Sequence, residues 1–361
     1  MKRLPSDPVA LVRATIVAEL DDVRDGPVVV ALSGGLDSCV LLHALRFSTA
    51  VETALVAAHF DHGMRSGSRS DAAWVRGVCK AWSVDLAEGG VTGSATVPTS
   101  EDEARDLRYA FLGDVAEQRG AVLLTAHHAD DQAETVLFRA LRGTGIEGLA
   151  GIPRRRVLDV DGDVGVTVVR PLLSLTRDDL EAYARQCVVP YRPDPSNESA
   201  SFARNVLRRT ILPLAEEKVA PGARRSLARL ADIAREEEAA WAAAMRFVLP
   251  ALDVRPGTEG DLGRRPDAKR CLSCRRDALV EVGPALAARV LRRMAGEHGL
   301  NLDRDTTRRG FAFVQNSQSG RYIELGRGVQ LHLKEDRVII VSSEKPETDP
   351  MRGSASLDRA E

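Results

Sequence analysis

Aromatic side chains are scarce in this 361-residue sequence, at 4% of all residues, so its hydrophobic cores are expected to consist mainly of Val, Leu, Ile and Ala. Apolar runs of about 18 residues are also lacking, and the N-terminal stretch 11–20 is interrupted by Arg13 and Glu19. We therefore expect neither a membrane span nor a signal peptide. The five cysteines are scattered and odd in number, which argues against a disulfide framework and favours a reducing cytoplasm.

The sequence also lacks an excess of charge of one sign, since its formal net charge is −2. Such a balance gives no global attraction to nucleic acid, so no DNA partner is expected, and any RNA binding must come from local basic clusters. Short arginine runs occur at 154–156, 264–265 and 308–309, although such runs are more often solvated surfaces than binding sites. The length favours two domains with sizeable cores.

Apolar strand patterns alternate with helical patterns over the first half of the sequence. This alternation predicts an α/β fold with a doubly wound parallel sheet, whose ligands bind at the carboxyl ends of the strands. Strands are predicted at 28–32, 54–60, 84–87, 121–126 and 166–169, and helices at 70–82, 101–119, from about 130 to 141, and at 177–186.

The sequence pattern changes after Pro221: the alternation of strand and helix patterns ends, and apolar residues recur at helical spacing. We predict a linker helix and a smaller α+β domain beyond it, with helices near 284–298 and 306–315, a hairpin around the turn at 326–328 and a strand at 338–341. Residues 250–276 are rich in Pro, Gly and charge and are predicted to be irregular. The predicted domains are 1–215, a linker helix at 216–248, the small domain at 249–342 and a disordered tail at 343–361.

A Ser-Gly-Gly-Leu-Asp-Ser turn, Ser33–Ser38, joins the first apolar strand to a helix. Two adjacent glycines permit a sharp turn, and the helix points its unpaired N–H groups at whatever lies there. We expect a phosphate group to be bound by Ser33, Gly34, Gly35, Leu36 and Ser38, with Asp37 better suited to Mg²⁺. No lysine of the G-x-x-x-x-G-K-[ST] type is present, which disfavours γ-phosphoryl transfer. The alternative is a plain turn capped by Ser33 or Asp37.

A second polar segment, His127–Thr135, lies where another apolar strand gives way to a helix. Its side chains are therefore expected at the same edge of the sheet as the first turn. Asp131 and Glu134 have the spacing of a capping box, and the two histidines could simply be hydrogen-bonded at a strand end. Adjacent carboxylates at a helix start near phosphates could instead bind Mg²⁺ or an incoming ammonium group.

These segments resemble the PP-loop ATP pyrophosphatases, whose SGGxDS turn binds ATP and whose reactions cleave between the α- and β-phosphates. Within that group, the order of motifs is similar to that of the tRNA(Ile)-lysidine synthetase family, and the similarity covers residues 28–215. The motifs are SGGLDS at 33–38, HFDHGMR at 59–65, EDEARDLRY at 101–109, HHADDQAET at 127–135, RGTGIEGL at 142–149, RPLL at 170–173, DPSN at 194–197, and Arg204-Asn205 with Arg208.

The resemblance implies ATP and Mg²⁺ as cofactors, and isoleucine tRNA with a CAU anticodon and L-lysine as partners. ATP would adenylate the wobble cytidine at its C2 carbonyl oxygen, releasing pyrophosphate, and the ε-amine of lysine would then displace AMP to form lysidine. The implied roles are metal binding and catalysis for Asp37 and Asp130, charge stabilisation for Arg105 or Arg108, nucleotide binding for the 33–38 turn with His59 and His62, and substrate binding for His127, Asp131, Glu134, Arg204 and Arg208.

Alternatives to this function remain open from the sequence. The main one is tRNA thiolation by other PP-loop enzymes, but Cys39, Cys79 and Cys187 do not form the paired arrangement expected for it. The other is an RNA-binding module, over 221–361, attached to a catalytically idle PP-loop part. The pattern around His59 and His62 is also compatible with structural histidines at a strand end.

Two further patterns carry little functional weight. Cys271 and Cys274 form half of a zinc motif, and neither a second pair nor a close histidine follows them. Gly143–Gly148 matches G-x-G-x-x-G, but it follows a predicted helix rather than a strand, so the dinucleotide-binding interpretation fails its required context.

Overall fold

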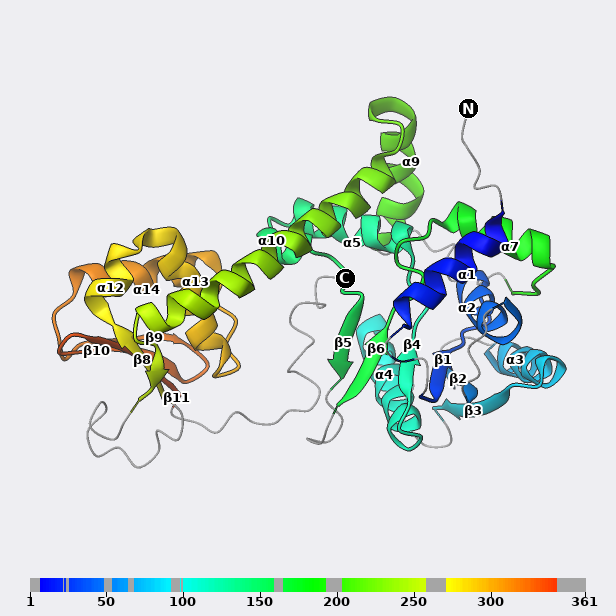
Figure 1. Ribbon diagram of the computed structural model, residues 1–361, viewed down its shortest axis with the longest axis horizontal. Helices are drawn as coiled ribbons and strands as arrows, with labels where there is room; N and C mark the ends of the chain where they lie inside the picture. Colours follow the sequence, from blue (N-terminus) through cyan, green and yellow to red (C-terminus); the bar gives the residue numbers. More distant parts are fainter. Residues whose placement is uncertain are drawn as a thin grey trace. The chain divides into compact units, whose positions relative to one another are not determined.

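The computed structural model describes residues 7–21, 23, 26–48, 54–63, 68–91, 98, 100–158, 165–192, 203–257 and 271–342. These residues form two compact units that divide after Glu237, inside a long helix (Figure 1). None of the described helices is long and apolar enough to cross a membrane. The DPSN segment at 194–197 and the predicted tail at 343–361 lie outside the described residues.

The first unit is built on a six-stranded sheet of order β3-β2-β1-β4-β6-β5. Neighbouring strands run parallel, with Val28 opposite both Leu55 and Val122, except that β5 pairs antiparallel with β6. The strands are β1 (Val28–Ala31), β2 (Leu55–Asp61), β3 (Asp85–Gly90), β4 (Val122–Leu124), β5 (Arg155–Leu158) and β6 (Val166–Val169). The predicted doubly wound sheet is therefore confirmed, and the antiparallel edge strand β5 was missed.

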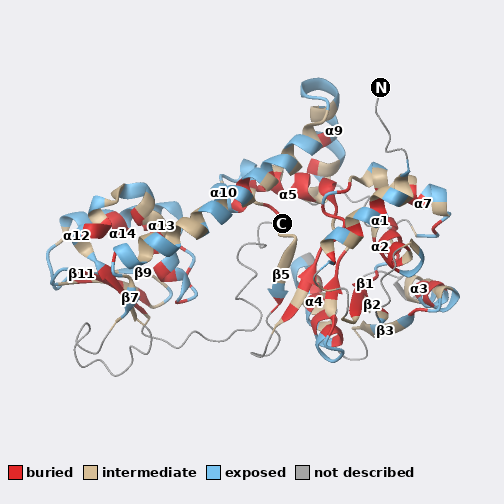
Figure 2. Cartoon of the chain, in the orientation of Figure 1, coloured by how far each residue is buried: buried red, intermediate tan, exposed pale blue. Residues whose placement is uncertain are grey.

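Helices cover both faces of this sheet. One core contains Val28 and Val30 together with residues of α1, α2, α3 and α7, whereas Val29, between them, belongs to a second core with α4. Figure 2 shows the buried central strands between these layers. The helices are α1 (Pro8–Glu19), α2 (Leu36–His43), α3 (Ser68–Trp82), α4 (Glu101–Glu117), α5 (Ala129–Leu141), α6 (Ile146–Leu149) and α7 (Arg177–Cys187).

The strand order reverses its direction at the centre of the sheet, between β1 and β4. From β1 the chain moves outward to β2 and β3, and later returns to β4 on the other side of β1. The loops that follow β1 and β4 therefore diverge, and such a switch point is where open α/β sheets bind their ligands. Both sequence motifs singled out above, 33–38 and 127–135, begin in these two loops.

A helical segment follows the sheet of the first unit. It comprises α8 (Ala203–Val206), a π-helical turn (Leu207–Ile211), α9 (Leu212–Leu214) and a second π-helical turn (Ala215–Val219). The long helix α10 (Ala223–Ala251) starts seven residues later than the predicted linker helix. The reason is local: Ala220 is extended, and Gly222 has a φ of +91°, a conformation that no helix continues through.

The second unit packs an antiparallel sheet against three helices around one apolar core. The strand order is β7-β8-β11-β10-β9, and alternate residues of β10, such as Val329 and Leu331, face that core. The elements are β7 (Arg255–Pro256), β8 (Cys271–Arg275), α12 (Arg276–Glu281), α13 (Gly283–Gly296), α14 (Arg304–Asn316), β9 (Tyr322–Gly326), β10 (Val329–Lys334) and β11 (Arg337–Ser342).

The prediction of irregular structure over 250–276 is wrong at both ends. Residues 271–275 form β8, which gains its hydrogen bonds from β11, more than 60 residues away in sequence, and α10 continues to Ala251. Because side chains alternate along a strand, Cys271 and Cys274 lie on opposite faces of β8, and Cys274 is fully buried in the core. They cannot hold one ion together, and no cluster of metal-ligating side chains occurs among the described residues.

We expect Cys274→Ser to destabilise the second unit without changing its metal content. Burial raises the pKa of the Cys274 thiol to about 12, so this side chain acts as a small apolar group. A hydroxyl in its place would cost roughly 1–3 kcal/mol of unfolding free energy. Denaturant unfolding measures the loss, elemental analysis of the wild-type protein should find no zinc, and Cys271→Ser is the matched control. Stoichiometric zinc would contradict this assignment.

Candidate functional site

The turn after β1 holds its two serine hydroxyls against each other. Ser33 Oγ and Ser38 Oγ are 3.1 Å apart, the Gly35 N–H donates to Ser33 Oγ, and Ser38 Oγ donates to the Gly35 carbonyl. Gly35 is the N-cap of α2 and has no side chain to cap the helix. The first N–H groups of α2 therefore remain available to an anion beside two hydroxyls.

Glycine is required at position 34 for two reasons. Its φ is +88°, and a Cβ there would lie 3.3 Å from the Cγ2 atom of Val75. We expect Gly34→Ala to cost about 1–2 kcal/mol in backbone strain and to distort the turn, which should weaken nucleotide binding. Calorimetric titration with a non-hydrolysable ATP analogue measures this loss. Gly77→Ala, on α3 with open space around its Cβ, is the control, and equal affinities would contradict the role of the turn.

His59 supports this turn from the neighbouring strand. Its side chain is buried, and Nδ1 lies 2.7 Å from the carbonyl oxygen of Leu32, the residue before Ser33. His62 lies beyond the end of β2, with its ring 5.1 Å from that of Phe60. The predicted nucleotide-binding roles of both histidines stay predictions, and the contact of His59 is the one that reaches the phosphate turn.

His128 is the N-cap residue of α5, and the acidic residue Asp131 takes part in the cap. The Asp131 carboxylate accepts the His128 main-chain N–H at 2.9 Å, and His128 Nδ1 lies 3.2 Å from the main-chain nitrogen of Asp130. The capping box therefore joins His128 to Asp131, not Asp131 to Glu134 as the sequence spacing allowed. Glu134 is one turn further on and is left for another role.

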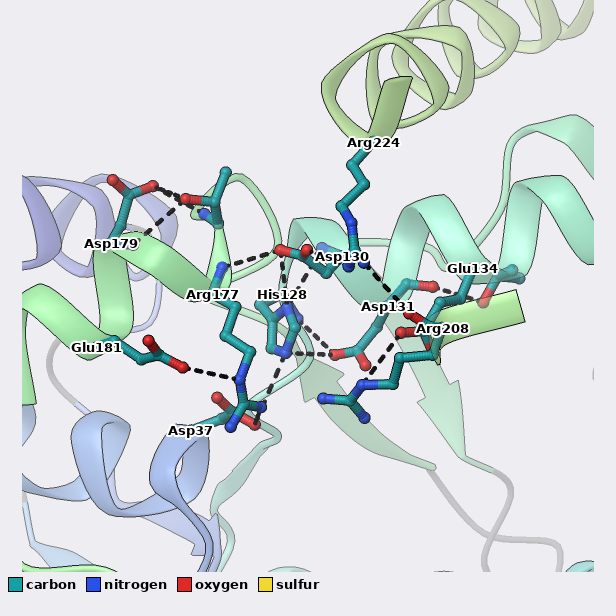
Figure 3. Close-up of polar contacts among 12 residues, drawn as sticks. Asp37, His128, Asp130, Asp131, Glu134, Arg177, Asp179, Glu181, Arg208 and Arg224 are labelled. Atoms are coloured by element: carbon teal, nitrogen blue, oxygen red, sulfur yellow. Dashed lines mark hydrogen bonds and ion pairs between the residues drawn. The ribbon is translucent and has the colours of Figure 1, made fainter. Parts of the chain in front are cut away.

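Three carboxylates surround the His128 ring (Figure 3). Nε2 lies 3.7 Å from Asp37 Oδ2 and 3.5 Å from Asp131 Oδ2, and Nδ1 lies 3.7 Å from Asp130 Oδ2. Burial alone would lower the pKa of His128, but Asp131, Asp130 and Asp37 outweigh it and raise the pKa to about 9. The two motifs predicted from sequence therefore meet at His128, a residue to which sequence analysis gave no separate role.

Asp130 connects three helices. Its Oδ1 accepts a hydrogen bond from Arg224 Nη1 at 2.8 Å, and its Oδ2 accepts the main-chain N–H of Arg177 at 2.9 Å. The Arg177 side chain also reaches Asp37, with Nη1 3.5 Å from Oδ2. Burial raises the pKa of Asp130, but His128, the Arg177 amide and Arg224 together lower it well below its ordinary value. The metal and catalytic roles of Asp130 stay predictions, since a cation would have to compete with these donors.

The structure brings Arg204 and Arg208 together with Glu134. All three were predicted to bind substrate, and that role stays a prediction. The Nε atoms of the two arginines lie 3.2 Å and 3.5 Å from the two carboxylate oxygens of Glu134, whose side chain is 1% exposed. Arg204 Nη2 also lies 3.9 Å from Asp131 Oδ1. Burial and the nearby Asp131 raise the pKa of Glu134, against the opposite effect of the two arginines.

Arg105 and Arg108 lie on α4 beside the ring of Tyr109, at 5.3 Å and 5.7 Å from its centroid. Burial, Arg170 and Arg105 hold the pKa of His127 well below its usual range. His127 is therefore neutral, and its Nδ1 lies 3.0 Å from Thr125 Oγ1. The predicted charge-stabilising role of Arg105 or Arg108 stays a prediction.

The residues around the turn fit a magnesium–nucleotide complex. Asp37 Oδ1 is buried and has no hydrogen-bond partner among the described residues, and burial raises the pKa of this carboxyl group despite the neighbouring His128. Arg177 and His128 both approach the other oxygen, Oδ2, so Oδ1 is the atom of this carboxylate that is left for a cation. Mg²⁺ commonly uses one or two carboxylates together with substrate phosphates and water, so a preformed cage of three protein ligands is not required.

Comparisons with known proteins agree with this geometry. The PP-loop domain family matches residues 11–215. The chain is 43% identical to the tRNA(Ile)-lysidine synthase of Pseudomonas fluorescens over 58% of this chain and 46% of that protein. It is 33% identical to that of Symbiobacterium thermophilum over 92% of this chain and 68% of that protein.

A solved structure shares the fold. The U34-tRNA thiolase NcsA from Methanococcus maripaludis, with its [4Fe-4S] cluster, superposes with a TM-score of 0.50 at 18% identity, over 62% of this chain and 78% of that one. At this identity the likeness concerns the fold alone. The chain spans about half the length of several curated relatives that it matches. The family match over residues 11–215 and the 33% identity over nearly the whole chain place this protein in the tRNA(Ile)-lysidine synthase family of PP-loop proteins.

Proposed function

We propose that this protein is a cytoplasmic enzyme that ligates L-lysine to C2 of the wobble cytidine of isoleucine tRNA with a CAU anticodon, converting ATP to AMP and pyrophosphate. The observation that carries the proposal is the meeting of two motifs at the switch point of the sheet. The phosphate turn contains Asp37, whose buried Oδ1 has no hydrogen-bond partner in the described part of the chain, and the second motif brings Asp131 and His128 to it.

In the first step, the C2 carbonyl oxygen of the cytidine attacks the α-phosphate and pyrophosphate leaves. The turn and the first N–H groups of α2 bind the phosphates, and Arg105 or Arg108 stabilises charge that develops on the α-phosphate. Asp37 would hold Mg²⁺, which would supply positive charge to screen the phosphates. In the second step, Asp131 and Glu134 bind the ammonium group of lysine and bring its amine, once deprotonated, to C2, from which AMP departs.

The cysteines support this function over tRNA thiolation. Burial raises the pKa of Cys39 to about 12 and that of Cys79 to about 11, and it also raises the pKa of Cys187. Protonated, buried thiols are poor nucleophiles and poor ligands for a cluster. No disulfide joins any of the five cysteines, all of which lie in described segments.

The test is incubation of the protein with ATP, Mg²⁺, labelled lysine and an unmodified isoleucine tRNA transcript. We expect labelled tRNA together with equal amounts of AMP and pyrophosphate. A transcript with uridine at the wobble position is the matched control and should remain unlabelled. Formation of ADP, or sulfur transfer that ignores lysine, would overturn the proposal, and tRNA binding without AMP release would favour the idle-module alternative.

If basic side chains of the second unit bind the tRNA backbone, affinity should fall steeply with salt. Proteins that bind several phosphate groups lose roughly a thousandfold in affinity between 50 and 200 mM salt. Arg308 and Arg309 are exposed on α14, so their joint replacement by Ala should reduce the salt slope by about one for each arginine that binds a phosphate group. Filter binding over a salt series measures this. The control is joint replacement by Lys, and a flat wild-type series would exclude phosphate binding by these side chains.

A further inference from the structure

Arg224 joins the first turn of α10 to the start of α5. Its Nη1 donates to Asp130 Oδ1 at 2.8 Å and its Nη2 to the Arg208 carbonyl oxygen at 3.3 Å. The main-chain N–H of Arg224 donates to Glu216 Oε1, and Glu216 Oε2 accepts the Gly222 N–H. Arg224 is therefore held both at its main chain and at its guanidinium group. Figure 3 shows its side chain reaching Asp130 from α10.

Two hydrogen bonds, this one and one from Arg177, hold the Asp130 carboxylate beside His128. Arg224 occupies Oδ1 and the Arg177 amide occupies Oδ2, so the plane of the carboxylate is defined by one donor at each oxygen. The side chain is only 11% exposed, and water can replace neither donor easily. Removing Arg224 would leave Oδ1 without its charged partner and allow the carboxylate to rotate about its remaining bond.

Asp130 in turn faces one edge of the His128 ring. Both its main-chain nitrogen and its Oδ2 approach Nδ1, at 3.2 Å and 3.7 Å. The opposite edge of the ring, Nε2, lies between Asp37 and Asp131. The imidazole is 1% exposed, so its orientation is set by these neighbours rather than by solvent.

We propose that Arg224 is a positioning residue of the catalytic site, which acts through Asp130 to keep the His128 ring between Asp37 and Asp131. Arg224 itself makes no contact with the phosphate turn, so its effect must pass through Asp130. This inference rests on the proposed function, because the site that it orders is the one assigned there to nucleotide and lysine. Sequence analysis could not assign the role, since Arg224 lies 94 residues from Asp130 and belongs to a short basic run.

The first measurement needs no substrate. Labelling the seven histidines with ¹⁵N and identifying His128 by its loss in His128→Asn gives a direct report on its ring. Arg224→Met should shift the His128 side-chain resonances and leave those of His298 and His332, in the second unit, in place. Asp130→Asn is the second variant, should Arg224→Met fail to fold, and it should shift the same resonances. Arg246→Met, at an exposed position of the same helix, is the control.

The second measurement is pyrophosphate release with tRNA and ATP. In Arg224→Met we expect kcat to fall about tenfold to a hundredfold, as for a misplaced catalytic group, with KM for ATP within about twofold of wild type. Arg224→Lys retains a cation for Asp130 and should recover most of the loss. A purely structural role would instead lower the melting temperature without separating kcat from KM.

The outcomes are separable from those of the proposed function. Unchanged His128 resonances in Arg224→Met would overturn the positioning role, whatever activity the variant has. A fall in kcat that Arg224→Lys does not recover also overturns it. If the wild-type protein releases no pyrophosphate, the proposed function fails, and the resonance shifts still decide whether Arg224 orders His128.

Discussion

Asp37→Asn should reduce pyrophosphate formation by about 10³-fold or more, the largest loss that we expect from a single substitution. Asparagine keeps the shape of the side chain but removes the charge at Oδ1, the buried oxygen that lacks a hydrogen bond within the described residues. A loss of about 4 kcal/mol in stabilisation of the leaving phosphates corresponds to this factor. Pyrophosphate release under single-turnover conditions, over a range of Mg²⁺ concentrations, measures it.

The Mg²⁺ series distinguishes the role of Asp37 from a general effect on the site. If Asp37 holds the cation, the midpoint of Mg²⁺ activation should move to higher concentration in Asp37→Asn, whereas a defect in tRNA binding would leave it in place. Asp85→Asn removes one carboxylate charge from an exposed position on β3 and is the matched control. Retention of wild-type turnover by Asp37→Asn would remove the metal assignment.

The parts of the fold that sequence predicts well are those whose signals are local. The strand before Ser33, the glycine turn and α2 lie within about 15 consecutive residues, and each part carries its own pattern. By contrast, β8 has no strong strand pattern of its own and becomes a strand because β11 provides its hydrogen bonds. The edge strand β5 was interpreted as a basic run for the same reason, since its pairing with β6 outweighs its weak local preference.

The candidate site divides in the same way. Asp37, Asp131 and Glu134 were predicted as candidates because they lie within motifs at the ends of strands, where open α/β sheets bind ligands. Arg177 and Arg224 lie 140 and 94 residues from the carboxylates that they contact, and their neighbours in sequence carry no sign of those contacts. Partners supplied by distant helices appear only when the chain is folded.

Glu134→Gln should separate the two proposed steps of the reaction. Lysine-dependent AMP release is expected to fall about a hundredfold, because the amide can no longer offer a negative charge to the lysine ammonium group, whereas formation of pyrophosphate should stay within about threefold of wild type. Glutamine can still accept the hydrogen bond from Arg204, so the local structure is disturbed less than by alanine. Rapid quenching with separate detection of pyrophosphate, AMP and adenylated tRNA measures both steps.

Accumulation of adenylated tRNA is the decisive sign in this experiment, because unfolding or loss of ATP binding would reduce both steps together. Raising the lysine concentration should recover part of the rate in Glu134→Gln if the defect is in lysine binding. Glu217→Gln, which removes a carboxylate from an exposed pair with Lys218, is the control and should behave as wild type. Equal losses in both steps would indicate that Glu134 holds Arg204 and Arg208 in place rather than binding lysine. Breaking these buried ion pairs would then disturb the whole site, and both steps with it.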